Sequence, residues 1–397
     1  MSETDRYRQA LIVYIVWHPQ FNRGEELAVR IYQHLCNDPK HSTARSIGIP
    51  VRFLTSVLDA HKLLLADVPV SADYTAVVML VDDEMVADSV WGDCVARIWD
   101  TYKQAGQAHR VYPVALSEYA FKLHPTLAEV NFIRLPLTMA DMQEQSLLNQ
   151  ITHELSRLLL HQPRTSDAGA HRAAGPAPLR VFLSHAKHDG LDLAQGVRAY
   201  IAAHTQMETF FDTHDIPPGT EWKKVLYEEA GDTQNALLIL QTDLYSTREW
   251  CRLEVLQAKL GWVPTLLVNA ISTYERRGFP YLGNIPTAKW PPSSEGDPYE
   301  TVLGMFLYEV LRAAYFPRKV NALAELYSVK RALKAIPYPP ELLTLLAMHR
   351  ILQEYPDTIF VYPDPPLGTE ERQLLREAMP HASLITPTLI PSLGRRH

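Results

Sequence analysis

The residues of this chain best suited to chemistry lie in the segment Trp250-Cys251-Arg252-Leu253-Glu254. Glu254 follows Trp250 by four residues, so on a helix the two side chains share one face. A carboxylate held in place stabilises positive charge that develops on a reacting atom, and the indole is either an aromatic wall beside it or part of a core. We interpret Cys251 as a small buried apolar group and not a nucleophile, because no base stands at a fixed spacing from it.

Strand and helix patterns alternate around this segment. Apolar strand candidates lie at residues 179–184, 208–211, 236–240 and 266–270, and helical stripes lie at residues 193–201 and 299–310. This alternation predicts a mainly parallel sheet that is covered on both faces. Because the helix that carries Glu254 follows the 236–240 strand, we expect Glu254 at the carboxyl edge of the sheet, where open α/β folds bind ligands.

The first 160 residues carry a similar pattern. Strand candidates lie at residues 10–17, 51–54, 76–81 and 111–116, and a closing helix lies at residues 145–160. Residues 161–178 are rich in Ala, Pro and Gly, which predicts a linker. We therefore expect α/β domains at residues 1–160 and 179–318. Residues 319–397 contain a strand–helix–strand pattern, which either belongs to a third α/β domain or extends the second sheet.

Three segments of the second domain resemble the TIR (Toll/interleukin-1 receptor) family in order and spacing. Residues 181–189, Val-Phe-Leu-Ser-His-Ala-Lys-His-Asp, are similar to the first strand and loop of that family. Residues 211–222, with Pro217, Pro218 and Gly219, resemble its BB loop. Residues 245–254 are similar to the Ser-x-x-Trp-Cys-x-x-Glu signature of plant and bacterial members, with one extra residue between Ser246 and Trp250. The resemblance covers about a third of the chain and implies a flavodoxin-like parallel sheet.

Members of this family either only assemble or also cleave the bond between nicotinamide and ribose in NAD. Nicotinamide in NAD is already a cationic leaving group, so one carboxylate near the ribose can stabilise the oxocarbenium-like transition state. The resemblance implies that Glu254 is the catalytic residue and that NAD+ is a substrate and not a bound cofactor. It also implies a set of substrate-binding residues, namely Ser184, His185, Asp212, Ile216, Trp222 and Trp250.

Purely structural roles would also account for some of these residues. Ser184 and His185 precede a turn and helix-capping segment led by Asp189, which would account for both without a ligand. An Asx-turn would account for Asp212. Trp222, like Trp250, is as compatible with a core position as with a pocket wall.

Three functions follow from the resemblance. The first is an NAD+ glycohydrolase that serves as a bacterial anti-phage defence effector and is activated by assembly. The second is an enzyme that makes a cyclic ADP-ribose signal. The third is a non-enzymatic scaffold that acts in signal transduction through TIR–TIR contacts, in which Pro218 and Gly219 matter but Glu254 does not. The expected partners are NAD+, other TIR domains through self-association, and a partner protein or small-molecule trigger.

Residues 79–95 parallel residues 239–254 in the second domain. Each segment has an apolar strand, an acidic loop and a tryptophan about ten residues after the strand. Four residues beyond Trp91, however, stands Val95, where the second domain has Glu254. We therefore expect the first domain to be a diverged TIR-like domain that is inactive on NAD and acts as a sensor, a regulatory partner or an assembly surface.

Composition and charge limit the remaining classes. The 397 residues carry a formal net charge of -7, so no global positive field favours nucleic acid. The apolar runs are too short to span a bilayer, and the polar N-terminus is unlike a signal peptide. The three cysteines are widely spaced and form no metal-binding pattern. These features predict a cytoplasmic protein without membrane, nucleic-acid or metal binding.

Overall fold

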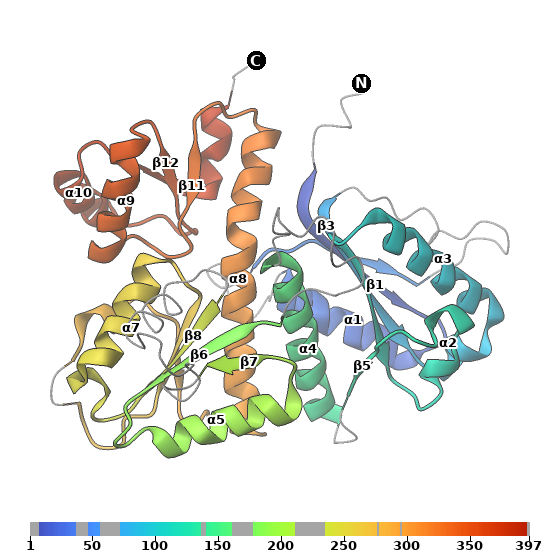
Figure 1. Cartoon of the computed structure of the whole chain (residues 1–397). Coiled ribbons are helices and arrows are strands. Elements are labelled where there is room, and N and C mark those ends of the chain that lie inside the picture. The colour runs from blue at the N-terminus through green and yellow to red at the C-terminus, as the bar shows by residue number, and fades with distance from the viewer. Residues whose placement is uncertain are drawn as a thin grey trace, which may run out of the picture. The chain divides into compact units, whose positions relative to one another are not determined.

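The computed structural model describes residues 8–36, 47–55, 72–135, 140–160, 178–210, 235–275, 278–293 and 296–394. The chain divides into two compact units, Met1–Leu159 and Leu160–His397 (Figure 1). Of the predicted linker at residues 161–178, only Pro178 lies within the described ranges. No helix in these ranges is both long and apolar enough to cross a lipid bilayer.

The described part of the first unit is built around one parallel sheet with the strand order β2-β1-β3-β4-β5. Its strands are β1 (Gln9–Trp17), β2 (Val51–Leu54), β3 (Ala72–Val81), β4 (His109–Ala115) and β5 (Ile133–Arg134). Its helices are α1 (Asn22–Leu35), α2 (Asp83–Ala87), α3 (Ser89–Ala105) and α4 (Ala140–Leu160), with short 3-10 turns η2 (Ala120–Lys122) and η3 (Pro125–Leu127).

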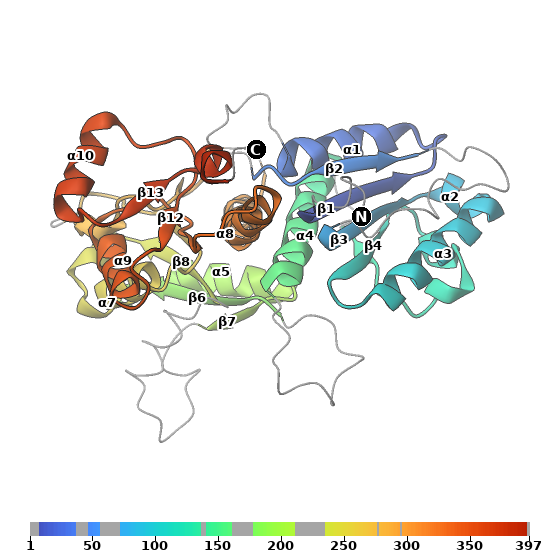
Figure 2. The ribbon, with the colours of Figure 1, turned by 90° about the horizontal axis from the view of Figure 1, so that it is seen from above.

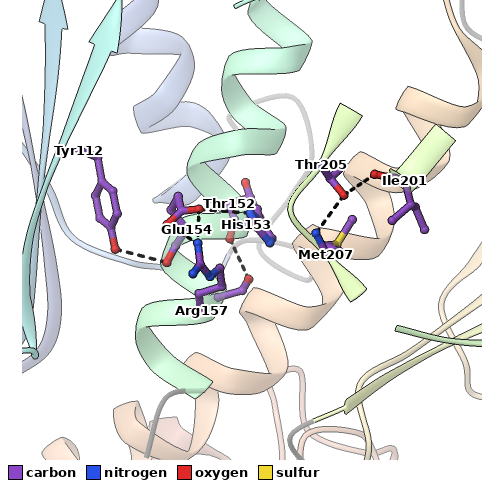
Figure 3. A network of polar contacts seen from close by, with 9 residues as sticks. Tyr112, Thr152, His153, Glu154, Arg157, Ile201, Thr205 and Met207 are labelled. Atoms are coloured by element: carbon purple, nitrogen blue, oxygen red, sulfur yellow. Dashed lines mark hydrogen bonds and ion pairs between the residues drawn. The ribbon is translucent and has the colours of Figure 1, made fainter. Parts of the chain in front are cut away.

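Both faces of the first sheet are covered, which explains why β1 and β3 read as continuous apolar runs and not as alternating ones. Helices α1 and α3 lie on opposite faces of the sheet (Figure 2). Helix α1 buries Leu27, Ile31 and Leu35, which recur at four-residue spacing and so share one side of the helix. On α4, Arg157 Nη1 donates to Glu154 Oε1 (2.9 Å), and Tyr112 of β4 donates to the main-chain oxygen of Glu154 (3.4 Å; Figure 3).

The second unit contains a parallel sheet with the strand order β10-β9-β8-β6-β7 among the described residues. Its strands are β6 (Arg180–His185), β7 (Glu208–Phe210), β8 (Asn235–Gln241), β9 (Thr265–Asn269) and β10 (Thr287–Lys289). Its helices are α5 (Leu191–His204), α7 (Glu249–Leu260) and α8 (Pro298–Leu326), with 3-10 turns η6 (Tyr245–Thr247) and η7 (Pro280–Leu282).

The two sheets have the same topology. Counted from the first strand of each, the order is 2-1-3-4-5 in both, which is the flavodoxin-like order. The expected fold class, a flavodoxin-like parallel sheet preceded by a second α/β domain, is confirmed. In each sheet the order reverses beside the first strand, so that the first and third strands, β6 and β8 in the second unit, flank the topological switch point.

The two faces of the second sheet pack against different helices. Side chains at alternate positions of β6, among them Val181 and Leu183, pack with α5 and α8. Phe182, between them in sequence, points to the other face and packs with Cys251 and Val255 of α7. Helix α7 therefore lies against the same face as the even-numbered residues of β6.

Residues after the second sheet form a small three-stranded parallel sheet with the order β11-β12-β13. It comprises β11 (Leu333–Ala335), β12 (Ile359–Val361) and β13 (Ser383–Ile385), with α9 (Leu342–Glu354), α10 (Thr369–Ala378) and the 3-10 turn η8 (Pro387–Leu393). The predicted strand–helix–strand unit is present as β12-α10-β13. Helix α8 continues through residue 318, the predicted end of the second domain, to Leu326.

This C-terminal sheet is attached to the rest of its unit by polar contacts at several points. Helix α9 lies beside α7 (Figures 1 and 2). Lys259 of α7 donates to Glu341 (2.7 Å) and to the main-chain oxygen of Gly283 (2.6 Å). The main-chain nitrogen of Thr265, the first residue of β9, donates to the hydroxyl of Tyr338 (3.1 Å).

Candidate active site

The candidate site lies at the carboxyl edge of the second sheet, beside its topological switch point. Ser184 is the penultimate residue of β6 and pairs in register with Ile239 of β8. Its side chain lies on the face that packs against α7, because Phe182, two residues earlier, does. The polypeptide that follows β8 passes through η6 into α7, so the elements that carry Ser184 and Glu254 converge at this edge.

Helix α7 presents Glu254 to the end of β6. Cys251, Val255 and Ala258 are its buried residues, and they fix which face of the helix meets the sheet. Glu254 is half-buried next to this face. Trp250, one turn earlier, is 38% exposed, so it belongs to the surface beside Glu254 and not to the core.

A chain of hydrogen bonds connects three elements at this edge. Ser184 Oγ donates to Glu254 Oε2 at 2.5 Å. The hydroxyl groups of Ser184 and Tyr245 are also 2.5 Å apart. Ser184 and Tyr245 are buried, with exposed fractions of 1% and 0%. The three side chains come from β6, η6 and α7, so the carboxylate is held by residues distant in sequence.

Burial controls the protonation of the neighbouring groups. Burial raises the pKa of Tyr245 well above its usual value, and the nearby Cys251 and Glu254 act in the same direction, whereas the hydrogen bond to Ser184 opposes them. Tyr245 therefore stays a neutral hydroxyl. Burial also raises the pKa of the Cys251 thiol, with Glu254 adding to the effect. A protonated, buried thiol agrees with the interpretation of Cys251 as a packing residue.

The loops after β6 and β8 are joined across the switch point. Asp189 Oδ2 accepts a hydrogen bond from the main-chain nitrogen of Leu244 (2.9 Å). The helix-capping role considered for Asp189 is wrong, because α5 has Gly190 at its N-cap and no side-chain capping bond. The Asp189 carboxylate instead holds the start of the turn that contains Tyr245.

A second carboxylate, that of Glu275, lies at this edge of the sheet and was not among the residues predicted from the sequence. Glu275 Oε1 accepts hydrogen bonds from Ser246 Oγ and from Gln241 Nε2, the latter at 3.0 Å. Ser246 thus binds Glu275 in this chain, whose segment between Ser246 and Trp250 is one residue longer than in the family signature. The adjacent residues Tyr245 and Ser246 therefore contact different partners, one belonging to the Glu254 hydrogen-bond chain and the other to Glu275.

The predicted site residues are only partly brought together. Ser184 and Glu254 are in direct contact, with Trp250 on the same helix. His185 is buried, and as the neighbour of Ser184 on β6 it points to the opposite face of the sheet. Three further predicted residues lie outside the described ranges, namely Asp212, Ile216 and Trp222.

Tyr245, like Glu275, was not among the site residues predicted from the sequence. It was visible as the first residue of the segment 245–254, four residues after the end of an apolar strand. Its role depends on contact with Ser184, which lies 61 residues away in sequence, and no local spacing rule predicts that contact.

The chemistry available here is electrostatic. A half-buried carboxylate that is fixed by a buried hydroxyl can stabilise a cation beside it without first having to reorganise. The described residues contain no group of three or more His, Cys, Asp and Glu side chains that could hold a metal ion.

A comparison with protein families agrees with this fold. A protein-family model described as "TIR domain" matches residues 181–269, which extend from β6 to β9 and include the Ser184–Tyr245–Glu254 hydrogen-bond chain. A comparison with curated proteins found no match. The parallel sheet, its strand order and the family match together identify the second unit of this chain as containing a TIR domain.

Proposed function

We propose that the TIR domain of this chain is an NAD+ glycohydrolase with Glu254 as its catalytic residue. The single observation that supports this most directly is the Glu254 carboxylate, which is half-buried at the carboxyl edge of the sheet and accepts a hydrogen bond from Ser184. A carboxylate that faced bulk solvent without a partner would not support the proposal.

The proposed reaction breaks the bond between C1 of the ribose and the nicotinamide nitrogen. The bonding electrons leave with nicotinamide, which becomes neutral, and positive charge spreads over C1 and the ring oxygen of the ribose. Glu254 stabilises this oxocarbenium-like state electrostatically. Water then adds to C1 and loses a proton, which gives ADP-ribose. Trp250, exposed one turn before Glu254, is proposed to line the substrate site.

The test measures free nicotinamide after purified full-length protein is incubated with NAD+, both as isolated and after fusion to a multimerising tag. Glu254→Ala and Glu254→Gln should abolish turnover, whereas Glu249→Gln, a carboxylate in the first turn of the same helix, is the matched control. Turnover by Glu254→Ala equal to that of wild type would remove Glu254 from the mechanism. The absence of turnover by wild type in every assembled state would leave a TIR scaffold.

The cellular role proposed for this activity is anti-phage defence by an effector that assembly activates. Overexpression should then lower cellular NAD+ and slow growth, and Glu254→Ala should abolish both effects. Mass spectrometry of the products separates hydrolysis from cyclisation, since a cyclic ADP-ribose product would assign the chain a signalling role.

The first unit is proposed to be catalytically inactive. Val95 occupies the position on α3 that corresponds to Glu254 on α7, four residues after a tryptophan. Trp91 is only 2% exposed and packs its ring against His18 (5.4 Å between ring centroids), unlike the exposed Trp250. A complete loss of turnover in Glu254→Ala is the expected result, and residual turnover that requires the first unit would contradict it.

A further inference from the structure

We propose that Tyr245 is a positioning residue for Glu254 and acts through Ser184. The Tyr245 hydroxyl donates to Ser184, Ser184 donates to the Glu254 carboxylate, and this chain of two hydrogen bonds fixes the carboxylate relative to the sheet. The proposal rests on the proposed function, since the position of Glu254 matters for a reaction only if the site cleaves NAD+. It also changes the expected role of Ser184 from substrate binding to orientation of Glu254.

The number of available protons determines which group donates in each of the two hydrogen bonds. A serine hydroxyl has one proton to donate, and an ionised carboxylate can only accept. Because Ser184 donates to Glu254, its oxygen must accept the proton of Tyr245. The other acceptor near the Tyr245 hydroxyl, the main-chain oxygen of Cys251, is farther away at 3.5 Å.

Burial makes this geometry stable. Both hydroxyl groups belong to residues with almost no exposed surface, so water does not compete for their hydrogen bonds. Ser184 is fixed by the pairing of β6 with β8. Tyr245 is fixed in η6, where its main-chain nitrogen donates to the main-chain oxygen of Thr242 and its main-chain oxygen accepts from the main-chain nitrogen of Arg248. A Tyr245 hydroxyl that turned away from Ser184 would exchange a short hydrogen bond for the longer one to the main-chain oxygen of Cys251 at 3.5 Å.

The first unit provides an internal comparison. Val16 pairs with Met79 on the first and third strands of its sheet, as Ser184 pairs with Ile239. Val16 therefore corresponds to Ser184, on the sheet face that packs against α3.

The other two positions differ in the same way. Met85 is the fourth residue after the end of β3, as Tyr245 is the fourth residue after the end of β8. Val95 corresponds to Glu254. Val16, Met85 and Val95 are all fully buried in one apolar cluster. The unit that lacks the carboxylate thus lacks both hydroxyls as well, as expected if the three groups work together.

A double-mutant cycle that measures turnover tests whether Tyr245 acts through Ser184. Tyr245→Phe removes only the buried hydroxyl and should lower kcat about tenfold with little change in KM. Ser184→Ala removes the charge-assisted bond and should lower kcat by roughly ten- to a hundredfold. In the Ser184→Ala background Tyr245→Phe should have almost no further effect, because Tyr245 acts only through Ser184. An equal fold-loss from Tyr245→Phe in both backgrounds would overturn the proposal.

A matched control separates positioning from a general loss of stability. Tyr338 has a hydroxyl bonded to the main chain of Thr265 at the start of β9, the opposite end of the sheet from Ser184. Tyr338→Phe should lower the unfolding midpoint and leave kcat and KM unchanged. A drop in kcat for Tyr338→Phe as large as that for Tyr245→Phe would mean that stability alone explains the result.

A second readout keeps the proposal testable if wild type does not cleave NAD+. The same cycle is then measured in urea, where the unfolding midpoints of Tyr245→Phe, Ser184→Ala and the double variant are compared. A loss in the double variant smaller than the two single losses combined shows that the hydroxyls are coupled, even though the proposed function has failed. Additive losses of stability would refute the proposed series of hydrogen bonds independently of any activity.

Discussion

The ion pair between Glu309 and Arg312 on α8 allows a quantitative prediction about how the C-terminal sheet is held. Arg312 Nε and Nη2 bind the two carboxylate oxygens of Glu309 at 3.0 and 2.6 Å, and Nη1 donates to the main-chain oxygen of Pro337 at 2.8 Å. The Glu309 side chain is 7% exposed and the Arg312 side chain is 19% exposed. Removing one member of a buried pair costs about 3–5 kcal/mol, because the remaining charge loses its partner.

We expect Glu309→Leu to lie near the lower end of that range, about 3 kcal/mol. Arg312 keeps its bond to Pro337 and its position over the ring of Tyr338, with 5.1 Å to the ring centroid. With a urea slope of about 3 kcal/mol/M, the unfolding midpoint should fall by about 1 M.

Glu309→Leu/Arg312→Met, which removes both charges, should be less destabilised than the single variant. Hydrogen exchange at the amides of α8 reports the same loss locally. A single variant within about 1 kcal/mol of wild type, or no better stability in the double variant, would refute the reasoning.

Three further predictions concern other positions. Burial lowers the pKa of His34 from 6.5 to about 4, so the unfolded chain binds a proton below pH 6.5 that the folded first unit does not. Stability should therefore fall by at most about 3 kcal/mol between pH 6.5 and 4, and urea titrations of His34→Gln should show a smaller fall; an unchanged pH dependence would contradict this. Gly196→Ala places a Cβ 2.3 Å from the Tyr299 hydroxyl oxygen and should cost about 1–3 kcal/mol, visible as a lower melting temperature. Burial lowers the pKa of Lys259, whereas the hydrogen bond to Glu341, the residue before α9, raises it. If the bond between Lys259 and Glu341 holds α9 in place, Lys259→Met should speed hydrogen exchange in α9. Unchanged exchange would count against it.

The central strands β1, β3 and β8 were predictable from sequence because they are buried on both faces. The strand at residues 236–240 and the observed β8 differ by one residue at each end, since a short continuous apolar run is typical of a strand in a covered parallel sheet. β5, β10 and β11 were missed. They have two or three residues each and form no apolar run, so each becomes a strand only by pairing with β4, β9 or β12.

The candidate site was predictable to the extent that it is local. Trp250 and Glu254 lie on one helix, and the spacing alone places them together. The bond from the Leu244 amide to Asp189, by contrast, joins residues 55 positions apart, so the sequence suggested a nearby helix cap for Asp189. Tyr245 was missed for the same reason. The flavodoxin-like strand order brings these two loops to one switch point, but it does not determine which of their side chains make contact.

The continuity of α8 limits where this protein can be shortened. A chain ending at residue 318 would stop inside α8, eight residues before its last residue, Leu326. Phe316 would remain but would lose the packing partners Val320, Val361 and Ile390. Expression of an isolated TIR domain would thus expose apolar surface and favour aggregation. Preparations intended for enzymology are better made with the C-terminal sheet retained.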